Sequence, residues 1–325
     1  MTPSRSALNA VFRAGLLALA LGSLASCGGG GGGPAISEPV PVDDPDTNPI
    51  VDTYQSLVAA DHAALPRLIP SMDALFERNP DDGVVAFYSG IVHLWNLTRA
   101  RQDPNRDLLS MAIESDTAIA SFERAVVLRP TSEHAAAFLG AALLAVGDYI
   151  GNEVRIEEGR RVIDGAVPLH PAYVNGVRGI GFGALARSHP LFAEAEPALF
   201  AVVEACGYQG SGEFGLRFAY PEGALPSPRR VCNDSGLVAH VWEGLFLTFG
   251  DVLVKQGDAA RARVVYENAR SSPAYDRWIL RDLLEERIAG ADARAALYLD
   301  DDPANDPLTW MEEDQVCVGC HASIE

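Results

Sequence analysis

One spacing of residues recurs along the chain and constrains its fold more than any other feature. A small residue is followed four positions later by a large apolar or aromatic one, then three later by a second small residue, and then by a proline. Spacings of three and four residues lie on one face of an α-helix. A recurring helical pattern predicts an array of similar units. The pattern occurs at Ala118, Phe122, Ala125 and Pro130, at Gly159, Ile163, Ala166 and Pro171, and at Ala262, Tyr266, Ala269 and Pro273.

Apolar stretches with a central glycine precede these segments, most clearly at Gly140 and Gly250. Gly250 stands twelve residues before Ala262, and Gly257-Asp258 lies in the expected turn between them. Together the features resemble the tetratricopeptide repeat (TPR), a helical hairpin of about 34 residues. In that family small residues let the paired helices approach closely. Gly90 and Gly181 stand at the corresponding positions of two further hairpins.

The resemblance covers roughly residues 80–273 and implies an all-α fold, a TPR-like array of four to five hairpins that forms an α-solenoid. The second helix of the Gly181 hairpin is degenerate, because Gly210 replaces the expected proline. TPR arrays are generic interaction scaffolds, so the resemblance indicates fold more than function. An irregular helical bundle is the alternative fold.

The repeat domain is expected over residues 52–299, beginning near Asp52, a residue type typical of a helix N-cap. Apolar spacing after Pro273 predicts a capping helix over 275–289 and a second helix over 291–299. Extra residues around 99–111, 152–158 and 207–235 interrupt the repeats and are expected in loops. Three tryptophans in apolar helical stretches are expected in the core: Trp95, Trp242 and Trp278.

The N-terminus predicts export and lipidation. Arg5 and Arg13 precede a short apolar run, as in a signal peptide over residues 1–26. The following Leu24-Ala25-Ser26-Cys27 resembles a bacterial lipobox, which implies that Cys27 is acylated and anchors the chain in a lipid membrane. Gly28 after that cysteine implies an outer-membrane lipoprotein facing the periplasm. A plain secretory signal is the alternative, and the glycine- and proline-rich residues 27–51 are expected to form a flexible tether.

The chain is strongly acidic, with a net charge of −19 and a pI near 4.7. Such a charge argues against nucleic acid or an anionic lipid surface as partner. A redox partner protein would then present a basic face. The alternative is a well-solvated acidic surface with no role in recognition.

The C-terminal tail, residues 300–325, contains Cys317-Val-Gly-Cys320-His321. In an exported protein, C-x-x-C-H is typical of covalent c-type haem attachment. Cys317 and Cys320 would form thioethers to the porphyrin, and His321 would ligate the iron as the proximal ligand. A Cys317–Cys320 disulfide is one alternative. A zinc site or a chance match is the other.

Cys206 and Cys232 bracket the long loop and are expected to form a disulfide in an oxidising compartment. Closing that loop would contribute about 3 kcal/mol of stability. Two free thiols are the alternative. For the second iron ligand, His240 is preferred because it starts the first helix of the last clear repeat, beside the predicted cap. An open site or a partner's ligand is equally compatible, and the other candidate side chains are His62, His93, His134, His170, His189, Met72, Met111 and Met311.

These features predict a periplasmic, lipid-anchored haem-binding protein that transfers or relays electrons and whose repeats dock a redox partner. Motifs for a hydrolase triad, a dinucleotide fold, a phosphate loop or an H-E-x-x-H zinc site are not found in the sequence. A carrier is therefore expected more than a catalyst, although an open haem could react with peroxide. The alternative is a non-redox TPR scaffold or a solute-uptake-associated lipoprotein whose C-terminal cysteines form a disulfide.

Overall fold

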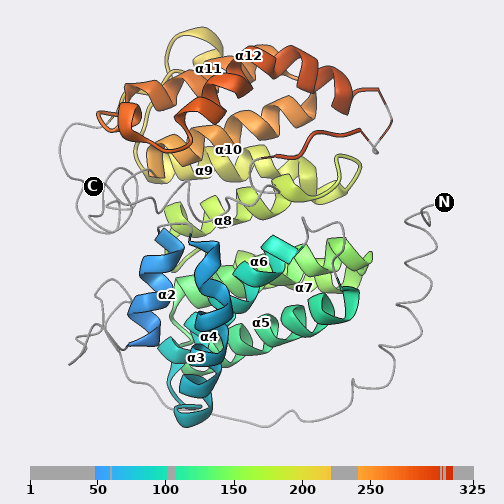
Figure 1. The fold of residues 1–325 in the computed structure, drawn as a ribbon. Helices are drawn as coiled ribbons and strands as arrows, with labels where there is room; N and C mark the ends of the chain where they lie inside the picture. Colours follow the sequence, from blue (N-terminus) through green and yellow to red (C-terminus); the bar gives the residue numbers. More distant parts are fainter. Residues whose placement is uncertain are drawn as a thin grey trace.

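A computed structural model describes residues 48–58, 61–100, 107–220, 241–300, 302 and 305–309. This part of the chain folds into α-helices and short 3₁₀ turns, with one isolated β-bridge between Ser211 and Arg217 and no strand (Figure 1). The predicted all-α class is therefore confirmed for the described ranges.

The helices follow one another closely along the chain. Their bounds are α2 Pro49–Val58, α3 Leu65–Arg78, α4 Gly83–Ala100, α5 Leu108–Leu128, α6 Glu133–Ile150, α7 Glu153–Ala166, α8 Pro171–Ala184, α9 Ala195–Ala205, α10 Val241–Gln256, α11 Ala259–Tyr266 and α12 Arg281–Tyr298. The 3₁₀ segments are η1 His62–Ala64, η2 Pro190–Glu194, η3 Glu213–Gly215, η5 Glu267–Ser271 and η6 Tyr275–Arg277.

Consecutive helices pack as neighbouring pairs: α4 with α5, α6 with α7, α8 with α9, and α10 with α11 (Figure 1). Two of the turns show why the chain reverses where it does. Gly151 and Gly257 both have positive φ, which glycine adopts without strain. Asn152 and Asp258 follow them and cap the next helices by accepting backbone N–H groups. α12 then packs on both α10 and α11.

Glycines allow the paired helices to approach one another, as the repeat pattern predicts. A Cβ on Gly250 would lie 2.1 Å from the Tyr266 ring, and one on Gly140 would lie 2.3 Å from the Ile163 side chain. Gly90 meets Phe122 in the same way, at 2.6 Å. Contacts this short exclude any side chain, so the glycine faces the large residue of the following helix in each of these three pairs.

The α8–α9 pair departs from the expected register. Gly179, and not Gly181, approaches the partner helix, since its Cβ would lie 2.6 Å from Leu199. A Cβ on Gly181 would instead meet Leu144 of α6, in the preceding pair. The prediction for Gly181 was therefore wrong: that glycine lies at the contact between successive pairs.

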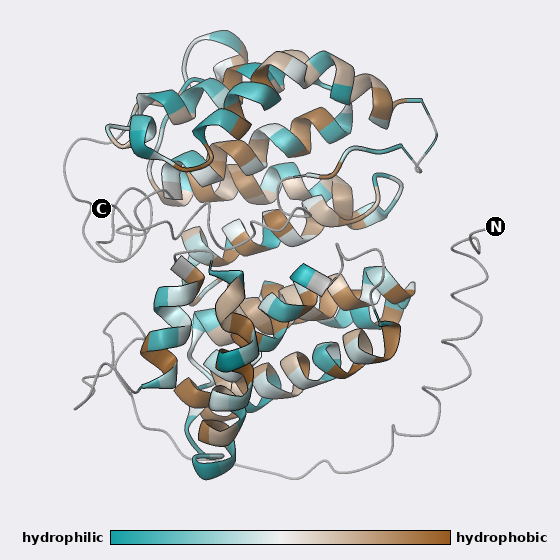
Figure 2. Ribbon diagram, viewed as in Figure 1, coloured by the Kyte–Doolittle hydropathy of each residue, from teal (hydrophilic) through white to brown (hydrophobic). Residues whose placement is uncertain are grey.

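Two apolar cores lie within the described part of the chain, and α6 contributes to both. The first core joins side chains from α2 to α6, and the second extends from α6 to α12. Leu143 packs in the first and Leu144 in the second, so adjacent residues of one helix face different cores. All three expected core tryptophans are buried, and the hydropathy colouring shows brown residues along helices that pack together (Figure 2).

The helix boundaries differ from expectation in two places. α2 begins at Pro49, and Asn48 accepts the N–H of Ile50, so Asp52 lies inside the first turn and does not cap the helix. α12 is one continuous helix where two were expected, because Ala291 and Ala295 are buried against the second core. That packing outweighs the weak helix propensity of Gly290, which separates the two expected helices.

α10 is the most enclosed helix of the described structure. Every residue from Trp242 to Lys255 is buried, including Glu243, Thr248 and Asp251. A helix that is buried all round lies inside a core. None of the described helices combines the length and apolar character needed to cross a bilayer.

Candidate functional site

Most residues predicted for the site lie outside the described ranges. These are Cys27, Cys232, His240, Cys317, Cys320 and His321. Of these, only His240 directly adjoins a described residue, and the last described residues of the chain precede Cys317. Val241, directly after His240, begins α10, and residues 305–309 precede Cys317 by a few positions.

Residues 305–309 run back from the end of α12 toward α10 (Figure 1). Tyr298 donates its hydroxyl to the carbonyl of Pro307, and Arg294 Nη2 donates to the carbonyl of Leu308 at 2.6 Å. Thr309, the next residue, is only 4% exposed. We call these two side chains and the backbone they hold the tail anchor.

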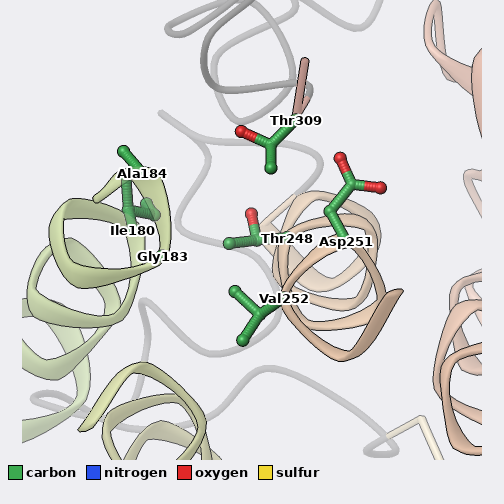
Figure 3. Close-up of a pocket in the computed structure, with 7 residues that line it drawn as sticks. All are labelled: Ile180, Gly183, Ala184, Thr248, Asp251, Val252 and Thr309. Carbon is green, nitrogen blue, oxygen red and sulfur yellow. The ribbon is translucent and has the colours of Figure 1, made fainter. Parts of the chain in front are cut away.

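Thr309 lies at a small cavity between α8 and α10 (Figure 3). Ile180, Gly183 and Ala184 line it from α8, whereas Thr248, Asp251 and Val252 line it from α10. Its volume is about 10 Å³, which is the space of one water molecule. Pockets that enclose a cofactor or drug-sized ligand are at least about 300 Å³. This cavity therefore cannot hold a haem.

A buried polar cluster lies next to this cavity. Tyr266 of α11 donates its hydroxyl to Asp251 Oδ1 at 2.5 Å, and Arg287 Nε of α12 lies 3.5 Å from the same oxygen. Burial, together with the charge of Asp251 and its hydrogen bond, raises the pKa of Tyr266 well above 10, so the phenol stays a donor. Because Arg287 offsets the carboxylate charge, the cluster serves to join α10, α11 and α12.

The only lysine of the chain fastens α8 to α10. Lys255 is buried, and its Nζ donates to the carbonyls of Gly183 at 3.0 Å and Ala184 at 3.4 Å. It also lies 5.5 Å from the centre of the Phe192 ring, within cation–π range. These carbonyls end α8, where the helix dipole is negative and favours a cation. Lys255 therefore stabilises the same α8–α10 contact that receives Thr309.

The other side chains predicted as possible second iron ligands already make other contacts, where the structure describes them. Met72 and Met111 are buried in the first core. His189 Nδ1 accepts the N–H of Leu191, and its Nε2 lies 3.2 Å from Glu153 Oε2. The remaining imidazoles take part in packing or capping: His62 on Trp95, His134 on Tyr173, and His170 as N-cap of α8. His240 stays the predicted ligand.

His93 of α4 lies between two carboxylates, one from α3 and one from α5. Its Nδ1 is 2.6 Å from Glu114 Oε2 of α5, and its Nε2 is 2.9 Å from Asp73 Oδ1 of α3. A protonated ring donates to both. Burial opposes its charge, but the hydrogen bonds and charges of Glu114 and Asp73 outweigh burial and raise the pKa of His93 above 6.5.

We expect His93 to make stability depend on pH. A raised folded pKa stabilises the fold fully below pH 6.5, and this contribution is lost as pH rises through the folded pKa. The unfolding free energy of the wild type minus that of His93→Gln should therefore decrease as the pH rises above 6.5 and through the folded pKa. Urea titrations at several pH values measure it. A difference that stays constant over this window would contradict a charged His93.

Cys206 caps α9, is buried, and is in a disulfide bond. Its predicted partner, Cys232, is outside the described residues, so this pairing stays a prediction. The loop after Cys206 packs on α10: Phe218 stacks on Phe246, with ring centres 5.6 Å apart. The Asn268 side chain holds that loop by accepting from Phe218 N and donating to Leu216 O, both at 2.8 Å.

Sequence reasoning missed the tail anchor, the Asp251 cluster and the bridged His93. Asp251 and Lys255 did carry a recognisable pattern, since both charges stand in an otherwise apolar helical run. Buried charges need partners, and this predicts a polar contact without naming it. Arg294 and Tyr298 had no such pattern, because their acceptors are backbone carbonyls.

Within the described residues, no cluster of three or more histidine, cysteine or acidic side chains is arranged to hold a metal ion. The described part of the candidate site is thus residues 305–309, which the tail anchor holds a few positions before the C-x-x-C-H motif. Comparison with known proteins found no matching family model, no matching curated protein and no matching solved structure.

Proposed function

We propose that this chain is a lipid-anchored, periplasm-facing haem protein that transfers or relays electrons. The observation that carries the proposal is the C-x-x-C-H motif in a chain whose N-terminus resembles that of an exported lipoprotein. Cys317 and Cys320 would hold one haem c covalently, and His321 would ligate its iron. Cys27 would carry the acyl chains that anchor the protein in the outer membrane.

We further propose that the helical pairs form a TPR-like solenoid that docks a redox partner. The close approach of the predicted glycines to large residues in three of the four pairs, α4–α5, α6–α7 and α10–α11, supports this relation. So does the contact of α6 with both cores, since each unit of a repeat array packs on its neighbours. The excess of acidic residues favours a partner with a basic face.

The haem proposal fits the described residues only if the group lies at the surface. The cavity at Thr309 is too small to enclose it, and α10 is buried from Trp242 to Lys255, so the haem would lie outside the two described cores. His240, the residue directly before α10, is the proposed second iron ligand.

Producing the full chain in a host that has the cytochrome c maturation machinery tests the proposal. We expect a haem that stays bound to the chain in denaturing electrophoresis and gives the pyridine haemochrome band of a c-type haem. Absorption spectra of the oxidised and reduced protein would then report the axial ligands. The Cys317→Ser, Cys320→Ser variant should lack both signals. A wild-type chain without covalent haem would contradict the proposal.

The closed helical cores favour one competing function. A non-redox scaffold or solute-uptake-associated lipoprotein would need only the helical array, which is complete without a cofactor. Cys317 and Cys320 would then form a disulfide. Alkylation before and after reduction, with the modified cysteines located by peptide mass, separates the two: Cys317 and Cys320 thiols that become reactive only on reduction indicate the scaffold.

A further inference from the structure

Phe214 is an exposed aromatic residue in a strained backbone conformation. Its φ is +56°, and among the described residues no other side chain but glycine stands at a positive φ. Gly215 also has a positive φ, and Glu213 accepts the N–H of Leu216 at 3.1 Å, so the chain turns here as in a type I′ turn. Glycine, asparagine and aspartate suit the centre of such a turn, and a large aromatic residue does not.

Burial of the ring does not offset this strain. Phe214 is 54% exposed and belongs to neither apolar core, whereas Leu216 and Phe218 of the same loop are buried in the second core. A single exposed apolar side chain is ordinary on a protein surface. Strain at the same residue is not, and strained residues concentrate at sites of binding and catalysis.

The loop that carries Phe214 is fixed at its base. Ser211 N donates to Arg217 O at 2.8 Å, and Arg217 N donates to Ser211 O at 3.0 Å. Arg217 also pairs with Glu267 of η5. A Cβ on Gly210 would lie 1.9 Å from the carbonyl oxygen of Gly215, so only glycine fits the neck of the loop. In Figure 1 the yellow loop projects past α11 at the top of the view.

We propose that Phe214 is the anchor of a docking surface, and that its ring enters an apolar pocket with a basic rim on a partner protein. Aromatic anchors that fill apolar pockets supply much of the binding energy of protein interfaces. Because the loop is already fixed, little conformational entropy is lost on binding. This inference does not depend on the haem.

Charge distinguishes among the surfaces that could receive the ring. Glu213 beside Phe214 is exposed, and the charge of Arg217 is offset by Glu267. The chain as a whole carries a net charge of −19. An anionic lipid surface and a second copy of this chain are therefore both disfavoured, whereas a basic rim is attracted.

Three variants of the full chain test the proposal. Phe214→Asn removes the ring and supplies a residue that the turn favours. Phe214→Trp keeps a large aromatic side chain at the same place. Val127→Asn is the matched control, because Val127 is 69% exposed on α5 and the two residue types have similar helix propensity.

The first measurement is urea unfolding of the three variants. Relief of the strain should make Phe214→Asn more stable, lowering its unfolding equilibrium constant about fivefold, while Val127→Asn stays close to wild type. A Phe214→Asn chain less stable than wild type would show that the ring serves folding, and would overturn the inference.

The second measurement places the photoreactive residue p-benzoylphenylalanine at position 214 or 127 of the full chain in its native cells. We expect a cross-link to one protein from position 214 and none from position 127. That protein, identified by mass and purified, should bind wild type and Phe214→Trp, bind Phe214→Asn about thirtyfold more weakly, and bind Val127→Asn unchanged.

Several outcomes of the cross-linking experiment contradict the proposal. These are no cross-link from position 214, a cross-link to lipid, or one to a second copy of this chain. Equal affinity for wild type and Phe214→Asn would exclude the ring as an anchor. An affinity that added salt leaves unchanged would exclude the basic rim.

Discussion

Replacing Cys317 and Cys320 by serine is expected to remove covalent haem completely, yet to leave the thermal unfolding midpoint within about 2 °C of wild type. In most small haem proteins the cofactor fills the core, so losing it unfolds the chain. Here both apolar cores are closed by protein side chains, and the cavity next to the tail has room for about one water molecule. The helical domain should therefore fold before haem is attached.

Circular dichroism and scanning calorimetry of the serine variant measure this directly. Cys206→Ser is the matched control, because it is the same substitution at a buried, disulfide-bonded cysteine. With Cys232 as its predicted partner, losing that bond would remove about 3 kcal/mol of stability, or about 5–10 °C in a domain of this size. A haem-free chain that unfolds as early as the control would mean that the haem belongs to the core.

Gly250→Ala should lower the free energy of unfolding by about 3 kcal/mol, a large effect for one methyl group. The new Cβ would lie 2.1 Å from the ring of Tyr266. That ring cannot move aside easily, because it is fully buried and its hydroxyl is bound to Asp251. The α10–α11 pair would have to separate, disturbing the contacts of α12 with both helices.

Gly165→Ala is the control for this prediction. Gly165 also lies within a helix, α7, but its would-be Cβ has no neighbour within 4 Å. There the substitution should stabilise the protein by about 0.5–1 kcal/mol, the usual difference between the two residues in a helix. Urea titration monitored by ellipticity measures both. Equal effects at the two positions would contradict the packing of Gly250 against Tyr266.

The pairing of helices was predictable because it depends on local spacing. Gly90, Gly140 and Gly250 each meet the large residue that the repeated pattern assigns to them. In the α8–α9 pair the same reasoning chose Gly181, two positions from Gly179. Several glycines stand on that helix, and spacing alone does not distinguish a contact within a pair from one between pairs.

The residue types of the candidate site could be predicted from the sequence, but their arrangement in space could not. Cys317, Cys320 and His321 are adjacent in the sequence, and so are recognisable without a structure. A second iron ligand would have to come from a distant segment, and His240 remains a prediction. Arg294 and Tyr298 could not be found in advance, since their partners are main-chain carbonyls that carry no residue-specific pattern.

By itself the sequence determined what depends on neighbours along the chain: the helices, the close glycine contacts of three pairs, and the motifs from which a lipid anchor and a haem are predicted. Only the tertiary structure decided what depends on distant segments meeting. It encloses α10 completely, joins Asp251 to Tyr266 and Arg287, and returns the tail to α8 and α10. The physical reason is that helix formation and capping are local, whereas burial and partner choice are settled by packing across the whole chain.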